Sequence, residues 1–102
     1  MSIPFVHSIG NNRVSTFVLV IMIFSMNFKR AFWLTEKDEM VSCPVLEDGT
    51  IQDWNWEYVS GEKGKPYFDN DHNFRCLVRI HNALKENKQQ GLYEVKIKEV
   101  VA

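Results

Sequence analysis

Cysteine is scarce in this chain, which contains only Cys43 and Cys76 among its 102 residues. Small secreted proteins that depend on disulfides usually carry several more cysteines than this. We therefore expect both thiols to be small buried hydrophobes in a reducing compartment, although the sequence leaves one disulfide open. The cysteine content thus favours a cytoplasmic protein, with membrane association or export as the alternatives.

A strong charge of one sign is also missing. The net charge of −1 arises from 12 basic and 13 acidic residues, so no whole-molecule field would gather nucleic acid or an anionic membrane. The apolar fraction of 45% and the charged fraction of 25% are typical of globular chains and exclude a disordered or fibrous protein. This length has room for one domain with one core.

No catalytic or ligand-binding motif is complete. Asp69–Asn73 begins like a calcium loop, but Phe74 stands where the tight turn needs glycine and Ile80 where a bidentate acid is expected. No C-x-x-C or H-x-x-x-H pair is present to start a zinc site, and no third residue can be assigned to orient Cys76 and a histidine for catalysis. Gly61–Pro66 lacks the spacing of a phosphate-binding loop. We therefore predict no metal, no cofactor and no enzyme activity.

Charge divides the chain into two parts. Residues 1–26 contain one charged side chain, Arg13, whereas the remaining 76 residues carry the other 11 basic and all 13 acidic side chains. We interpret residues 1–26 as an apolar N-terminal segment, either a strand or an extension outside the fold. Residues 27–102 are interpreted as a single α+β domain.

The apolar run from Val14 to Phe24 supports three hypotheses. Its many β-branched residues favour a strand buried on both faces. A membrane segment through residues 14–28 would span only about 22 Å of a roughly 30 Å hydrocarbon core. A signal peptide would need a small-x-small cleavage site, which is absent after the run. We expect the run to pair within a sheet, and a position at the sheet edge would favour a homodimer.

Alternating residues on both sides of Asp48-Gly49 predict a β-hairpin, and Phe28–Leu34 predicts a strand before it. A two-residue loop at Asp48-Gly49 would place Cys43 opposite Trp54. The hairpin would then present Val41, Cys43, Val45, Trp54, Trp56 and Tyr58 on one face. We expect this face to meet a helix, giving a core of Trp54, Trp56, Phe74, Leu77, Leu84, Val95 and Ile97.

The helix is predicted from about Asn70 to Lys88, with Gly91 as its stop. Its apolar side would comprise Phe74, Leu77, Val78, Ile80, His81 and Leu84, opposite a solvated stripe of Arg75, Arg79, Asn82 and Glu86. A last strand, Leu92–Val101, would turn Tyr93, Val95 and Ile97 inward. The predicted fold is α+β: a small antiparallel sheet in the order β-β-β-α-β, with an additional N-terminal strand left open, and one amphipathic helix on one face.

Aromatic and basic residues form the one constellation that suggests a binding surface: Trp54, Trp56, Tyr58, Lys63, Lys65, Tyr67, Arg75 and Arg79. The leading hypothesis is a non-enzymatic accessory protein that acts through protein contacts, and short lysine- and asparagine-rich chains of this kind are often viral or from mobile elements. The second is a single-stranded nucleic-acid-binding protein, whose rings stack bases while lysines meet phosphates. The third is a small membrane-tethered protein. Exposure of the tryptophans separates the first two, because rings buried under the helix cannot stack bases.

Overall fold

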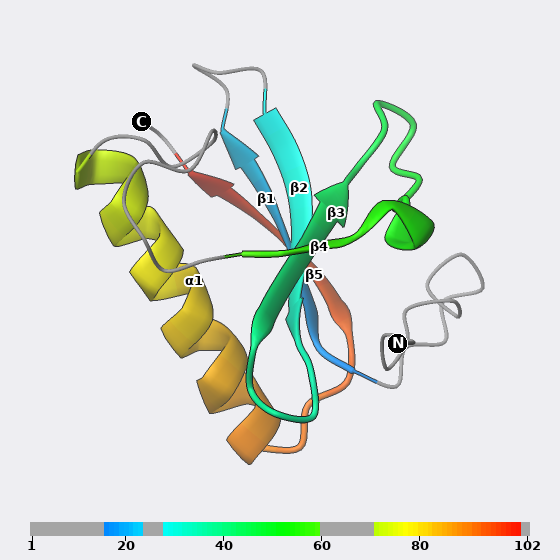
Figure 1. The fold of residues 1–102 in the computed structure, drawn as a ribbon. Helices are drawn as coiled ribbons and strands as arrows, with labels where there is room; N and C mark the ends of the chain where they lie inside the picture. The colour runs from blue at the N-terminus through cyan, green and yellow to red at the C-terminus, as the bar shows by residue number, and fades with distance from the viewer. Residues whose placement is uncertain (1–15, 24–27, 60–70, 101–102) are drawn as a thin grey trace.

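The computed structural model describes the backbone of residues 16–23, 28–59 and 71–100, and the side chains of residues 16–22, 29–59 and 75–98. Within these ranges the chain forms a sheet with one helix against it (Figure 1). The elements in chain order are β1 (Val18–Ile23), β2 (Phe28–Leu34), β3 (Met40–Pro44), the 3₁₀ turn η3 (Asp53–Asn55), β4 (Glu57–Tyr58), α1 (Asp71–Gln89) and β5 (Val95–Val100).

The sheet has five strands in the order β4-β3-β2-β1-β5. Strands β1 to β4 form an antiparallel meander, as the sequence predicts. After β4 the chain passes through α1 and returns as β5, which pairs parallel to β1 and makes the sheet mixed. The α+β class and the additional N-terminal strand are therefore confirmed.

Strand β1 is an interior strand, paired with β2 on one edge and β5 on the other. Val18 and Val20 are buried on one face, and Leu19 and Ile21 on the opposite face. This two-sided burial suits the continuous run of β-branched and apolar residues. The predicted strand is thus present over Val18–Ile23, while residues 14, 15 and 24 lie outside the described ranges. A homodimer was predicted only if this strand lay at the edge of the sheet. Because β1 is an interior strand, that condition is not met.

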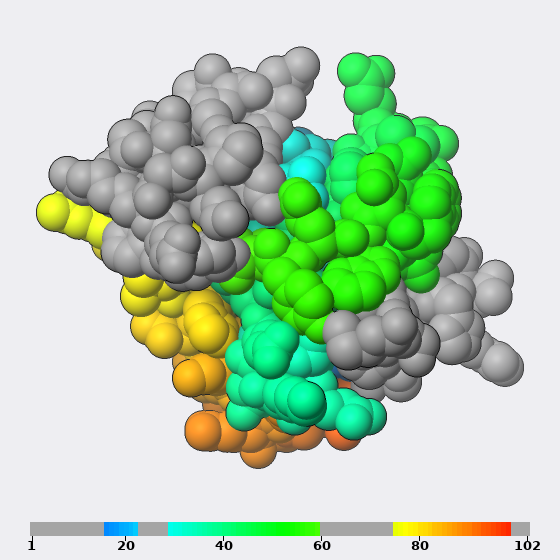
Figure 2. All heavy atoms as spheres, viewed as in Figure 1, coloured from blue at the N-terminus to red at the C-terminus, as the bar shows by residue number. Residues whose placement is uncertain are grey.

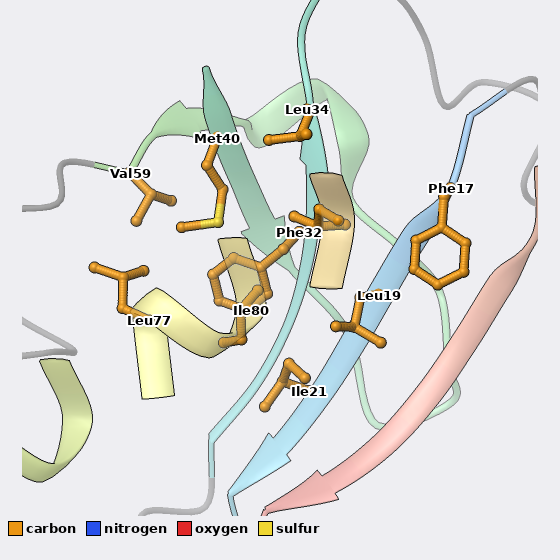
Figure 3. Close-up of a cluster of buried hydrophobic side chains, with 10 residues drawn as sticks. Phe17, Leu19, Ile21, Phe32, Leu34, Met40, Val59, Leu77 and Ile80 are labelled. Carbon is orange, nitrogen blue, oxygen red and sulfur yellow. The ribbon is translucent and has the colours of Figure 1, made fainter. Parts of the chain in front are cut away.

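Helix α1 packs on one face of the sheet. Figure 3 shows Leu77 and Ile80 of the helix directed toward Phe32, Met40 and Val59, with side chains of β1 extending the same cluster. The buried members are Phe17, Leu19, Ile21, Phe32, Leu34, Met40, Val59, Leu77, Ile80 and Leu84. Leu77 and Leu84 are core residues as predicted, whereas Val78, which was predicted on the apolar side of the helix, is 44% exposed.

Helix α1 ends at Gln89, and Gly91 closes its C-terminus as predicted. Gly91 has φ of +70° and donates its N–H to the carbonyl of Lys88, while Leu92 donates to the carbonyl of Asn87. These two bonds form a Schellman motif, which favours glycine at the left-handed position. The stripe of Arg75, Arg79, Asn82 and Glu86 is exposed, in agreement with the sequence.

A second cluster fills the face of the sheet opposite α1. Its buried members are Val18, Val20, Ala31, Trp33, Val41 and Cys43, with Val45, Ile51, Trp56 and Val95 packed against them. The prediction that Trp54 and Trp56 join the helix-facing core is therefore wrong, because Trp56 packs on this second face and Trp54 is 69% exposed. Val95 also belongs to this face, and Phe74 lies outside the described side chains.

The last strand differs from its prediction in extent and exposure. It begins at Val95 instead of Leu92, since the bonds that end the helix occupy Gly91 and Leu92. Tyr93 is 65% and Ile97 is 62% exposed, so neither is a core residue. Ile97 is exposed because β5 lies at the edge of the sheet, where its side chains have neighbours on one flank only, and Tyr93 precedes the strand.

The hairpin tip is where the sequence places it, but its loop is one residue longer than predicted. The carbonyl of Leu46 accepts from Gly49, the N–H of Leu46 donates to Thr50, and Val45 bridges Ile51. Gly49 has φ of +91°, so the loop is a turn closed by a left-handed glycine. The predicted partners of Cys43 and Val41 are wrong, because the longer loop and the turn η3 together move Tyr58 into the place opposite Val41 that was predicted for Trp56. This shift of two residues leaves Trp56 on the face of Val41 and Cys43, as predicted.

A candidate protein-contact surface

Three of the predicted contact residues form one surface, which we call the aromatic surface: Trp54, Trp56 and Tyr58. The turn η3 removes Asp53–Asn55 from the sheet, so that Val41 pairs with Tyr58 instead of Trp56. This displacement carries Trp54 into solvent. The sequence alternation of Trp54 and Trp56 resembles a strand and gives no sign of the turn.

The aromatic surface combines one free ring with two supported ones. The rings of Trp56 and Tyr58 meet edge to face, with centroids 5.1 Å apart and planes at 84°. Trp56 is partly buried against the second cluster, and Tyr58 is 44% exposed. An edge-to-face pair is a favourable aromatic geometry and holds both rings in place. The exposed Trp54 therefore lies close in sequence to a pair of rings that hold each other in place.

The chain around the aromatic surface is acidic. Residues 46–58 contain Glu47, Asp48, Asp53 and Glu57 and no lysine, arginine or histidine. Hydrogen bonds from Thr50 lower the pKa of Asp48, which keeps that carboxylate charged. This segment, in green, covers much of the right-hand side of the space-filling view (Figure 2). Its charge favours a cationic partner over an anionic one.

The other predicted contact residues do not join this surface. Arg75 and Arg79 are exposed on α1, and Figure 1 shows α1 and η3 on opposite sides of the sheet. Lys63, Lys65 and Tyr67 lie outside the described residues. The structure thus brings together the aromatic members of the predicted site and separates them from the two arginines.

A polar network missed by the sequence analysis lies on the helix side of β2, β3 and β4. Arg30 donates from Nε to Ser42 Oγ at 2.7 Å and from Nη2 to Glu57 Oε1 at 3.1 Å. Ser42 is fully buried and the Arg30 side chain is 14% exposed. The network links three strands side by side, and the sequence offers no signal for it because the strand register decides which residues meet.

Cys43 and Cys76 are both buried thiols, as expected for hydrophobic cysteines. Cys43 belongs to the second cluster, whereas Cys76 is on α1, which packs on the opposite face. Burial raises the pKa of Cys43 to about 12, with Asp53 adding to the effect and Arg30 opposing it. A thiol with such a pKa is protonated at neutral pH and is a poor nucleophile.

The turn between β2 and β3 is fastened to the end of α1. Lys88 forms an ion pair with Asp38, and His81 Nε2 lies 3.3 Å from the Asp38 carbonyl oxygen. Beside this contact is a cavity of about 300 Å³, whose lining includes Phe17, Leu84 and Tyr93. Its lining combines an apolar wall with Glu36 and with Lys88, which forms the ion pair with Asp38.

Within residues 16–22, 29–59 and 75–98, no three histidine, cysteine, aspartate or glutamate side chains are grouped to hold a metal ion. Likewise, no helix in the described part of the chain has the length and hydrophobicity needed to cross a membrane.

Comparisons with protein-family models, curated proteins and solved structures find no match to this chain.

Proposed function

We propose that this chain is a small non-enzymatic binding protein that acts through protein–protein contacts made by the aromatic surface. The observation that carries the proposal is the 69% exposure of Trp54 on an acidic segment, beside the Trp56–Tyr58 pair. Tryptophan and tyrosine are the residues most enriched at the energetic centres of protein interfaces. An exposed indole on a rigid base costs little conformational entropy when it is buried by a partner.

The charge around the rings defines the chemistry of the partner. Four carboxylates and no basic side chain lie within residues 46–58, so the rim of the complementary surface should carry lysine or arginine. The centre of that surface should be an apolar pocket able to accept the Trp54 ring.

A second candidate function, binding of single-stranded nucleic acid, is favoured by the same exposure of Trp54. An exposed indole can stack on a base, and Trp54 is exposed enough to do so. The acidic segment opposes this function, because a phosphate backbone would approach the carboxylates of Glu47, Asp48 and Asp53. The fourth carboxylate, Glu57, is paired with Arg30 on the helix side. Arg75 and Arg79 lie on the far side of the sheet from η3 and offer no compensation there. We therefore place protein binding first.

The membrane-tethered alternative would use residues 14–28. Val18–Ile23 of this range form a strand that pairs on both edges, so insertion into a bilayer would require those pairings to break. A cytoplasmic location is part of the proposal, and its support is the pair of buried thiols, Cys43 and Cys76.

The test compares affinity capture by the full chain with capture by two single variants, Trp54→Ala and Tyr93→Ala. Tyr93 is the matched control, because it is an aromatic residue of similar exposure outside residues 46–58. We expect a protein retained by the full chain and by Tyr93→Ala to be lost with Trp54→Ala, at a cost of about 2 kcal/mol or more, roughly 30-fold in affinity.

A fluorescent oligothymidine titration accompanies the capture experiment. Tight binding of this oligonucleotide that is abolished by Trp54→Ala would contradict the protein-contact proposal and favour the second candidate. Equal capture of the same protein by all three chains would show that the aromatic surface is not the interface.

A further inference from the structure

Strand β5 leaves one backbone edge open. It pairs with β1 on one side and is the last strand in the sheet order of the described residues. The N–H of Val18 donates to the carbonyl of Glu94 at 2.8 Å, which fixes the orientation of the peptide groups. Because a strand's peptide groups alternate between its two edges, those of Lys96 and Lys98 face β1, and those of Val95 and Ile97 face outward.

The side chains of β5 differ in chemistry on its two faces. Lys96 pairs with Leu19 and Lys98 with Ile21, so both exposed lysines lie on the helix side of the sheet. Val95 and Ile97 lie on the opposite side, where Ile97 is 62% exposed. The strand therefore presents a cationic flank and an apolar flank, separated by an outward row of hydrogen-bonding groups.

A groove lies beside the apolar flank. It has a volume of about 190 Å³, and its lining includes Val20, Lys29, Val45, Ile51, Val95 and Ile97. The groove joins the hairpin tip to β5, so an apolar side chain from an added strand would contact residues from both. The cation at its rim, Lys29, matches the sign of the charges on the other flank.

We propose that the open edge of β5 is a docking site for an extended protein segment in which acidic and apolar residues alternate. The segment adds to the sheet as a sixth strand, bonding to the outward peptide groups of Val95 and Ile97. Its acidic side chains meet Lys96 and Lys98, and its apolar side chains enter the groove. This site uses none of the three aromatic residues and does not rest on the proposed function.

A second copy of the chain is a poor occupant of the same edge. In a two-fold symmetric pair of β5 strands, the outward peptide groups can bond only if one residue lies directly opposite the same residue of the second copy. Centring the pair on Ile97 places Lys96 opposite the second copy's Lys98, and centring it on Lys96 or Lys98 places that lysine opposite itself. Centring it on Val95 would place Lys96 opposite Glu94, but Glu94 precedes β5 and only residues 95–97 of the strand would then be paired. Like charges directly opposite each other destabilise a strand pair, and edge lysines oppose sheet-to-sheet association. An acidic segment reverses that repulsion into attraction.

The probe for the test is a short fluorescein-labelled peptide of alternating glutamate and valine, titrated with the full chain and followed by fluorescence anisotropy. Replacing glutamate by lysine gives the charge control, and N-methylating alternate residues along each edge of the peptide in turn gives the backbone controls. We expect the lysine-containing peptide to bind about tenfold or more weakly than the parent peptide. Methylation of the peptide edge that faces β5 should weaken binding by the same factor. Raising the salt concentration should also weaken binding of the parent peptide.

Two variants of the chain test the two contacts separately. Ile97→Pro removes an outward N–H without touching the bonds to β1, a position that tolerates proline on an edge strand. Lys96→Glu/Lys98→Glu reverses the cationic flank on exposed side chains and should leave the fold intact. Each change should lower the affinity of the chain for the parent peptide about tenfold or more. Ile97→Val and Trp54→Ala should change that affinity less than about twofold.

The proposal is overturned if the full chain does not bind the parent peptide at ~1 mM. It is also overturned if Ile97→Pro, verified as folded by circular dichroism, binds as tightly as the unaltered chain. Loss of peptide binding in Trp54→Ala alone would instead assign the peptide to the aromatic surface and refute the β5 site.

Discussion

Leu77→Ala tests the packing of α1 on the sheet. Leu77 is 2% exposed within the helix-facing cluster, near Val59, Met40 and Ile80 (Figure 3). Removing about three carbon atoms from a buried site forfeits roughly 2.4 kcal/mol of transfer free energy. The space left behind adds a cavity cost, which the flexible Met40 side chain should reduce by moving into it. We expect a total loss of about 3 kcal/mol.

The assay is urea unfolding followed by the helical circular dichroism signal. The midpoint should fall while the denaturant slope stays unchanged, since the surface exposed on unfolding is nearly the same. Val78→Ala is the matched control, because Val78 is the next residue along the helix and is 44% exposed. It should cost well under 1 kcal/mol. A loss below about 0.5 kcal/mol for Leu77→Ala, or equal losses for the two variants, would refute the assigned helix face.

Three further variants test the hairpin, the second cluster and the N-terminal strand. Gly49→Val should destabilise the domain by about 1–2 kcal/mol in thermal unfolding, because a φ of +91° strains the backbone of any residue with a side chain. An added Cβ would meet no atom within 4 Å, so this strain and not a steric clash sets the cost. An unchanged melting temperature would contradict the turn. Cys43 should resist iodoacetamide at pH 8 in the folded chain and react after denaturation. Because its pKa is raised in the folded chain, the free energy of unfolding should fall as pH rises from about 9 toward 12. Cys43→Ala should reduce that fall. A shortened chain beginning at Met26 should not fold, because β5 would lose β1, its strand partner among the described residues; an unaltered circular dichroism spectrum and size would refute that role.

The Asp48-Gly49 pair locates the hairpin correctly because glycine is favoured wherever φ is positive. It cannot distinguish a two-residue loop from a three-residue loop, since both place a glycine at a left-handed position. The loop length alone does not misplace Trp56, because the longer loop and η3 together shift the register by two residues and leave Trp56 on the face of Cys43. The tryptophans were misplaced because the local sequence shows neither the turn at Asp53–Asn55 nor that α1 covers the other face of the sheet.

The helix and β1 were more predictable, for different reasons. In α1 the spacing of Leu77, Ile80 and Leu84 identifies the buried stripe, and Gly91 marks its end. In β1 a continuous apolar run indicates burial on both faces. The parallel pairing of β1 with β5 could not be predicted, because it joins segments far apart in the chain through a crossover whose course no local pattern encodes.

The candidate site was only partly predictable. Trp54, Trp56 and Tyr58 gather because they are close in sequence, but the side of the sheet that α1 covers determines where Arg75 and Arg79 lie. That choice depends on the large apolar residues Leu19, Ile21 and Phe32 filling the helix-facing side. The cationic flank of β5 was likewise hidden, because the sequence does not show which strand lies at the edge.

The central claim, that the aromatic surface is a protein interface, is tested most directly by a photo-crosslinker in place of a ring. Benzoylphenylalanine is introduced at Trp54 in one full chain and at Tyr93 in another, and both are irradiated in the cells that naturally make the protein. We predict a discrete protein adduct from the probe at position 54 that is absent or much weaker from the probe at position 93. A nucleic-acid adduct at position 54, or the same protein adduct from both positions, would contradict the claim.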